Sequence, residues 1–228
     1  SIRNDVAFEI ARRCPSLAWT PHGRFVNVVT NGREKGMYYI CEQIRIDENR
    51  VDITEMEHGD NSEDKISGGY LLECDVYYDE PFKFYTSVMN MPFLVKQPGE
   101  EVMTQSKNYW IKKYCSEIES RLYNNIGSGS YRELLDADSF IDFWFVQELT
   151  NNGEPNHPKS CYMYKDRGEK LFAGPVWDFD WCTFTYKGEE FACRDAIWYG
   201  CLFNDPWFRR RVKEKWSAEK EDFEDVAS

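Results

Sequence analysis

Residues 174–181 read Gly-Pro-Val-Trp-Asp-Phe-Asp-Trp, and this stretch decides how the rest of the chain is interpreted. An apolar run that reads as a strand, residues 171–176, leads directly into Asp178 and Asp180, with Phe179 between them. In a strand the two carboxylates would point to one face, and in a tight turn they could converge on one metal ion. Their spacing is equally compatible with capping a turn or accepting hydrogen bonds from the neighbouring indoles.

Upstream of this stretch the pattern indicates a buried helix, a loop and a hairpin. The helix is predicted at residues 139–150, capped by Asp138-Ser139 and apolar on nearly every side. A loop rich in Asn, Gly and Pro follows at residues 151–158, and strands at 160–165 and 171–176 form the hairpin. Phosphoryl transfer needs such parts, because a Mg²⁺ ion held by carboxylates must bridge the nucleotide phosphates while another group orients the acceptor hydroxyl.

The first hundred residues are rich in predicted strands. An amphipathic helix at residues 2–13 precedes strands at 24–29 and 36–42, which form a hairpin because Asn31-Gly32 supplies the positive-φ pair of a tight turn. Further extended segments are predicted at residues 68–75, 82–85 and 93–96.

From about residue 100 onward, the apolar residues follow the spacing of helices. One long helix is predicted from its N-cap Thr104 to about Asn124, and another at residues 206–223. The sequence therefore predicts one α+β domain. Its β-rich part covers about residues 1–100, and its mostly helical part, with the candidate metal site, covers about 101–228.

Size and charge restrict the function. The chain has 228 residues, 42% of them hydrophobic, which is enough for one globular domain or two lobes that share a cleft. A net charge of -12 weighs against a nucleic-acid partner. The cationic residues that do cluster are interpreted as a solvated helix face: Arg209, Arg210, Arg211, Lys213 and Lys215.

The eight cysteines include no CxxC pair and are accompanied by only three histidines, so a structural zinc site is not expected. Most of them stand singly in apolar runs, which leaves free buried thiols and disulfides both open. No segment approaches the ~20 apolar residues of a membrane span, and no signal-peptide pattern is present.

The sequence resembles the CotH kinase family, known from bacterial spore coats and many secreted bacterial proteins. The most specific piece is residues 174–181, similar to the family's Pro-Trp-Asp-x-Asp element. The resemblance covers nearly the whole chain and includes Asn31-Gly32 and residues 36–43, 68–73 and 162–166.

This resemblance implies an atypical, two-lobed, protein-kinase-like fold that uses ATP and Mg²⁺ to phosphorylate protein Ser or Thr hydroxyls. Asp178 would be a catalytic metal ligand, assisted by Asp180. The family's loop reads Asn-x-Asp, followed five residues later by Asn, in which Asp is the catalytic base and Asn a metal ligand. Here Glu154 stands in place of the base, and Ser160, six residues on, in place of the metal-binding Asn.

Three more side chains are candidates for cofactor binding. Lys159 would clamp a phosphate, although an ordinary loop lysine is the simpler interpretation. Glu42 and Glu73 would pair with a nucleotide-binding lysine, although exposed strand carboxylates are the simpler interpretation. The resemblance places the family's nucleotide-binding lysine upstream of the first helix.

The altered loop supports a second hypothesis, a catalytically degenerate CotH-like domain that acts as a surface-binding or coat-assembly module. A carbohydrate-binding or glycosidase domain is a third hypothesis, but aromatic residues belong to a core more often than to a sugar platform. The resemblance also implies an extracytoplasmic location, with a signal or anchor upstream. Expected partners are ATP, a protein substrate and a cell-surface or coat protein.

Overall fold

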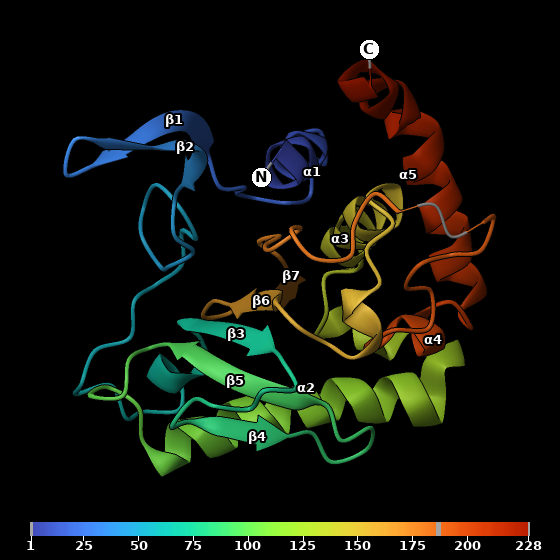
Figure 1. Ribbon diagram of the computed structural model, residues 1–228. Helices are drawn as coiled ribbons and strands as arrows, with labels where there is room; N and C mark the ends of the chain where they lie inside the picture. The colour runs from blue at the N-terminus through green and yellow to red at the C-terminus, as the bar shows by residue number, and fades with distance from the viewer. Residues whose placement is uncertain (1, 186–187, 228) are drawn as a thin grey trace.

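The computed structural model describes residues 2–185 and 188–227 and has an α+β fold, as predicted (Figure 1). The helices are α1 (Ile2–Arg12), α2 (Gln105–Asn125), α3 (Ala137–Leu149), α4 (Tyr199–Leu202) and α5 (Pro206–Glu224). The strands are β1 (Gly23–Thr30), β2 (Arg33–Cys41), β3 (Tyr70–Cys74), β4 (Lys83–Tyr85), β5 (Pro92–Gln97), β6 (Cys161–Lys165) and β7 (Leu171–Ala173). Short 3-10 helices are η1 (Lys65–Ser67), η2 (Ile126–Ser128), η3 (Ser130–Glu133), η4 (Glu154–Asn156) and η5 (Asp225–Ala227).

A five-stranded antiparallel sheet with the order β4-β5-β3-β6-β7 forms the centre of the molecule (Figure 1). It joins strands from both halves of the sequence, because β3 pairs with β6 over the register Tyr70↔Lys165 to Cys74↔Cys161. The predicted strands at 82–85 and 93–96 are β4 and β5. The division into two lobes near residue 100 stays a prediction.

The two faces of β3 carry different chemistry. Leu72 and Cys74 are fully buried, and the Cys74 thiol interacts with Cys115 on α2, so this face packs against that helix. Since side chains alternate along a strand, Glu73 and Asp75 point to the opposite face. Many aromatic residues belong to the core, including Trp198, Tyr70, Tyr131 and Tyr199.

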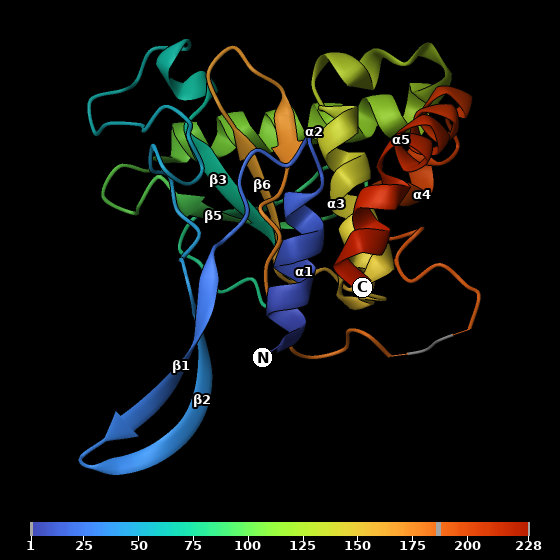
Figure 2. The ribbon, with the colours of Figure 1, turned by 90° about the horizontal axis from the view of Figure 1, so that it is seen from above.

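The two-stranded sheet β1–β2 projects away from this body (Figure 2). It is the predicted hairpin, and its turn residues Asn31 and Gly32 have φ values of 53° and 72°. The strands are exposed along most of their length, with Met37 74% and Val29 61% accessible.

Helix caps were predicted with mixed success. Thr104 caps α2 by accepting a hydrogen bond from the Lys107 amide, as predicted. The predicted cap of α3 was two residues too late, because Asp136 is the N-cap and accepts a hydrogen bond from the Ser139 amide at 2.9 Å. Ser139 is therefore the third residue of the helix.

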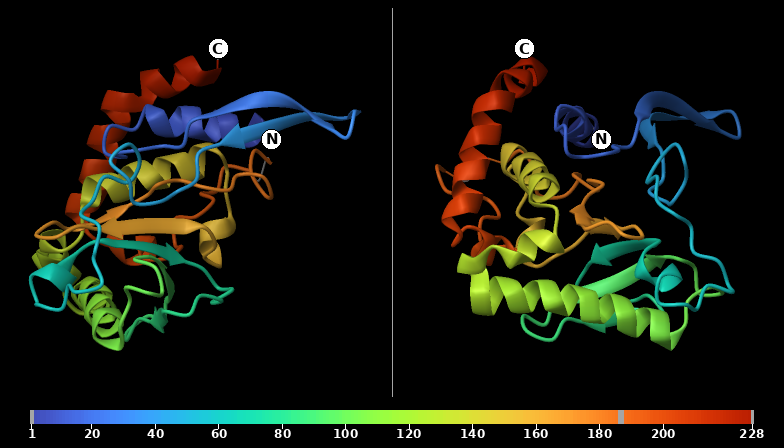
Figure 3. Two further views of the ribbon diagram at one scale, coloured as in Figure 1. Left: turned by 90° about the vertical axis from the view of Figure 1, so that its left-hand side faces the viewer. Right: turned by 180° about the vertical axis from the view of Figure 1, so that it is seen from behind.

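Helix α5 lies alongside α3, as the two views of Figure 3 show. Its cationic run is not wholly a solvated face, which corrects the prediction. Lys215 is only 5% exposed and pairs with Asp142 of α3 at 2.9 Å. Arg211 pairs with Asp138 at 2.7 Å, whereas Arg209 and Arg210 are exposed as expected.

All eight cysteines lie in the described part of the chain, and no disulfide joins any two of them. Among the described helices, none combines the length and the apolar character that crossing a membrane requires.

Candidate functional site

Three carboxylates from separate segments interact beside the polar face of the central sheet. Glu154 lies in η4, Asp178 follows β7 and Asp75 follows β3. Burial raises the pKa of Glu154 to about 7, and the charges of Asp178 and Asp75 act in the same direction, while Lys159 opposes them. The structure therefore brings predicted residues Glu154, Asp178 and Lys159 together.

The loop after α3 fixes Glu154 through a buried asparagine. Asn152 accepts a hydrogen bond from the Glu154 amide at 3.1 Å and donates one to the Gln147 side chain at 2.8 Å. Glu154 is 5% exposed, so its carboxyl group is held largely away from water. Asn152 was not among the predicted site residues, but an Asn two residues before an acid is a sequence signal for this turn.

Asp178 is exposed although its neighbour Phe179 is fully buried. The Phe179 amide donates to Asn4 of α1 at 2.7 Å, and its ring meets Phe8 edge-on at 6.3 Å. With the backbone anchored on this side, the positive φ of Asp178, 59°, turns its carboxylate outward. That carboxylate has no hydrogen bond or ion pair with any described residue, so its oxygens are available to a cation.

Asp180 has different neighbours. Its backbone carbonyl accepts a hydrogen bond from Arg3 at 3.0 Å. Burial raises the pKa of Cys41, and the negative charge of Asp180 acts in the same direction. Asp178 thus acts on Glu154, whereas Asp180 acts on the base of the hairpin.

Ser160 meets the carboxylate cluster through its backbone. Its amide donates to Asp75 at 3.3 Å, and its φ is 52°. Asp75 is 6% exposed and also accepts a hydrogen bond from the Tyr77 amide at 2.7 Å. Asp75 was missed by the sequence analysis, although the alternation of β3 puts it on the same face as Glu73.

Lys159 stands at the exposed side of this cluster. Its ammonium group donates to the Tyr77 hydroxyl at 2.8 Å and lies 4.2 Å from the centre of that ring and 5.5 Å from the Trp181 ring. It also contributes favourable charge to Glu154. Two aromatic rings therefore position a cation that acts on Glu154.

Glu73 is 7% exposed, so the prediction of an exposed strand carboxylate was wrong for this residue. It pairs with Lys96 of β5 at 3.3 Å, and Lys96 also contacts Glu80. Burial raises the pKa of Glu73, which Lys96 opposes. The sequence analysis missed Lys96, because nothing local shows that β5 lies beside β3.

Glu42 lies just beyond the end of β2 and contacts His22. It accepts hydrogen bonds from the His22 amide at 2.9 Å and from the His22 ring nitrogen Nδ1, 3.0 Å away. The bond from the His22 amide lowers the pKa of Glu42. No described lysine pairs with it.

A cavity of about 360 Å³ is lined in part by Lys96, the ion-pair partner of Glu73. Trp177, the residue before Asp178, forms part of its wall together with Tyr162. Its polar lining carries two cations, Arg45 and Lys96. The size and the mixed lining suit a ligand with an aromatic ring and negative charge.

The chemistry of the donors fits Mg²⁺ in one specific way. Within residues 2–185 and 188–227 no three His, Cys, Asp or Glu side chains gather as a metal cage. Protein-bound Mg²⁺ usually takes one or two carboxylates and completes its shell with water and substrate phosphates. The exposed Asp178 carboxylate, whose charge acts on the buried Glu154, fits this arrangement.

Comparison with known proteins identifies the family of the chain. A search of curated proteins found no match. A family model described as CotH kinase protein matches residues 1–225, nearly the whole chain, and the protein therefore belongs to the CotH kinase family.

Proposed function

We propose that this domain is an ATP-dependent protein kinase of two-lobed, kinase-like organisation that uses Mg²⁺ to phosphorylate Ser or Thr hydroxyls. Family membership supports a kinase-related function. The single observation that carries the proposal is the pairing of an exposed Asp178 with a buried Glu154 whose pKa is raised to about 7. Titratable groups perturbed in this way concentrate at catalytic sites.

The nucleotide would occupy the cavity next to Trp177. An adenine ring would stack against Trp177 or Tyr162, and Lys96 and Arg45 would face the phosphates. Lys96 already pairs with Glu73, which supports its assignment as the nucleotide-binding lysine. This assignment replaces the expectation of a lysine upstream of α1, and leaves Glu42 outside the nucleotide site.

Glu154 would accept the proton of the acceptor hydroxyl. A base with a pKa near the working pH combines a useful deprotonated fraction with good proton affinity. Burial and the Asp178 charge give Glu154 this property. Its hydrogen-bonded loop would hold the carboxylate in place, and Lys159 would hold a phosphate or the acceptor at the exposed side.

Asp178 would hold Mg²⁺, with Ser160 and Asp180 as the proposed assisting ligands. When bound, the ion neutralises charge on the transferring phosphate. The location outside the cytoplasm and a coat or cell-surface partner remain part of the proposal, and rest on the family alone.

The test measures Mg²⁺-dependent ATP binding by calorimetry and phosphate transfer to a Ser- and Thr-containing protein. We expect Asp178→Asn to reduce transfer roughly 100-fold, as for the loss of an electrostatic group at a reacting centre. Asp195→Asn, at a carboxylate whose side chain is 77% exposed, serves as the matched control and should behave as wild type.

A second function, a degenerate domain that binds a surface or coat partner, is favoured by one observation. Ser160 stands where the family's loop has its amide metal ligand. Equal binding heats for wild type and Asp178→Asn, with no phosphate transfer by either, would select this function and reject the kinase.

A further inference from the structure

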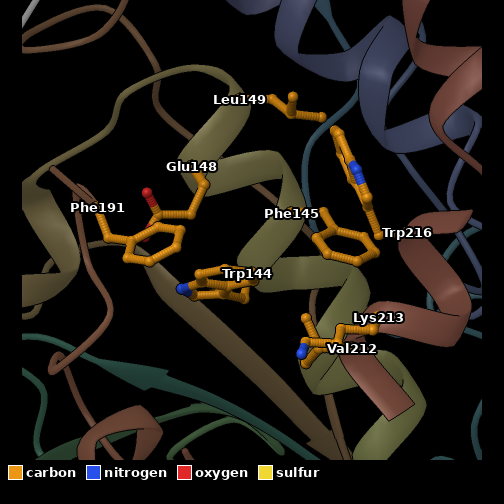
Figure 4. A pocket seen from close by; sticks show the side chains of 8 residues that line it. All are labelled: Trp144, Phe145, Glu148, Leu149, Phe191, Val212, Lys213 and Trp216. Atoms are coloured by element: carbon orange, nitrogen blue, oxygen red, sulfur yellow. The ribbon is translucent and has the colours of Figure 1, made fainter. Parts of the chain in front are cut away.

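A second cavity lies between α3 and α5 and has a volume of about 420 Å³ (Figure 4). None of the three clustered carboxylates lines it. Four aromatic rings surround it, from α3, α5 and the segment before α4. Its lining residues are Trp144, Phe145, Glu148, Leu149, Phe191, Val212, Lys213 and Trp216.

The rim of this cavity keeps large apolar side chains in contact with water. Phe191 is 63% exposed, Trp216 40% and Leu149 36%. Exposed apolar groups that converge on a concave space are typical of binding sites, because a ligand removes them from water. The proposed kinase chemistry uses none of these residues.

The two charged residues of the lining differ in their partners. The Glu148 carboxylate accepts hydrogen bonds from the Ala192 amide at 2.6 Å and the Cys193 amide at 2.9 Å, so both its oxygens are engaged. Lys213 is exposed and forms no ion pair with a described carboxylate. Its neighbours on α5 differ, since Arg211 pairs with Asp138 and Lys215 with Asp142.

We propose that this cavity binds a small amphipathic organic anion. An aromatic or short aliphatic body fills the space between the rings, and a carboxylate or sulfonate pairs with Lys213. A volume of about 420 Å³ lies in the range of small-molecule sites. The uncompensated cation beside an apolar space selects a ligand with a negative group, and the engaged Glu148 offers no free acceptor for a cationic one.

Hydrogen bonds connect this cavity to the loop of Glu154. Glu148 holds the amide of Ala192, and Asn156 of η4 donates to the carbonyl of the same residue at 2.7 Å. Phe191, which lines the cavity, precedes this doubly held residue. A ligand that packs on Phe191 therefore stabilises the segment around Ala192 and, through Asn156, the loop that carries Glu154.

The probe for the test is 8-anilinonaphthalene-1-sulfonate, with the uncharged N-phenyl-1-naphthylamine as its comparison. Fluorescence titration of the full chain should show one saturable site for each dye. Lys213→Glu should weaken binding of the sulfonate about five- to tenfold, the range of an exposed ion pair and its reversal, and leave the neutral dye within about twofold. Lys220→Glu, on the exposed side of the same helix, is the control and should change neither.

Hydrogen exchange of the dye-bound protein supplies a second measurement. Amides of residues 189–193 and 151–158 should exchange more slowly with the sulfonate bound, and Phe191→Ala should remove this protection. Four results overturn the proposal: no saturable site, equal effects of Lys213→Glu and Lys220→Glu, unchanged exchange at 151–158, or a dimer that Phe191→Ala dissociates. The last would make this face a contact between copies of the chain. None of these measurements depends on kinase activity.

Discussion

The two sheets of the molecule are both antiparallel but have different surroundings. Every residue of β3 in the five-stranded sheet is buried, whereas most residues of β1 and β2 in the two-stranded sheet are exposed. The five-stranded sheet packs on α2 and carries Glu73 and Lys96, while the hairpin stands outside the body (Figure 2). The difference shows that alternation and turn residues specify a strand, but long-range packing determines its contribution to stability and function.

Truncating one aromatic ring in each sheet is the strongest test of this difference. Phe93 of β5 is fully buried and stacks on Phe84 at 5.4 Å, so Phe93→Ala should lower the free energy of unfolding by about 3–5 kcal/mol. Phe25 of β1 is 39% exposed, and Phe25→Ala should cost about 1 kcal/mol or less. Urea unfolding measures both values, and equal costs would refute the comparison.

The raised pKa of Glu154 predicts that the stability of the main body of the protein depends on pH. Its folded pKa, about 7, exceeds the ordinary 4.5, so folding favours the protonated form. Below pH 4.5 the group is neutral in both states, and between pH 4.5 and 7 the unfolded chain loses its proton first. The free energy of unfolding therefore falls as the pH rises from 4.5 to 7, by roughly 3 kcal/mol relative to that of Glu154→Gln. Unfolding of both proteins at pH 4.5 and 8 measures it, and a pH-independent difference would contradict the assignment.

Breaking the ion pair between Lys96 and Glu73 should have a smaller effect on stability. Lys96→Met leaves Glu73 buried without its cation and should cost about 1–2 kcal/mol, and adding Glu73→Gln should restore part of this. Arg13→Met is the matched control, because Arg13 and Glu9 form a pair in which both side chains are 40% exposed and should contribute little. Thermal unfolding of the three variants and the wild type distinguishes these cases. A double variant less stable than Lys96→Met would argue against the pair.

The smallest effect is expected in the hairpin turn. Gly32 has a φ of 72°, a conformation that strains alanine. Gly32→Ala should therefore lower the free energy of opening of the hairpin by about 1 kcal/mol. Hydrogen exchange of β1 and β2 amides should accelerate about fivefold, while global unfolding stays unchanged. Gly59→Ala, where an added methyl also meets no neighbour but no positive φ is required, should change neither.

Local signals predicted much of the fold. Asn31-Gly32 specified a turn and Thr104 a helix start, because both depend on atoms within a few residues. The cap of α3 was misplaced because three residues that can cap a helix follow one another closely: Asp136, Asp138 and Ser139. Which of them caps depends on how the helix is packed, and the spacing of residues does not reveal that.

The candidate site was predicted less completely. The resemblance pointed to Glu154, Asp178 and Lys159, which the structure brings together. The burial of Glu73, the pairing with Lys96 and the presence of Asp75 depend on strands and loops distant in sequence. A strand's own alternation gives the face of each side chain, but not what covers that face.

The hydrogen bond between Asn4 and the Phe179 amide joins residues 175 positions apart. Because contacts of such separation require a large loop to close, they form late when a chain folds. During synthesis the first helix would emerge long before its partner, and the turn at Asp178 could take its final shape only after Phe179 had left the ribosome.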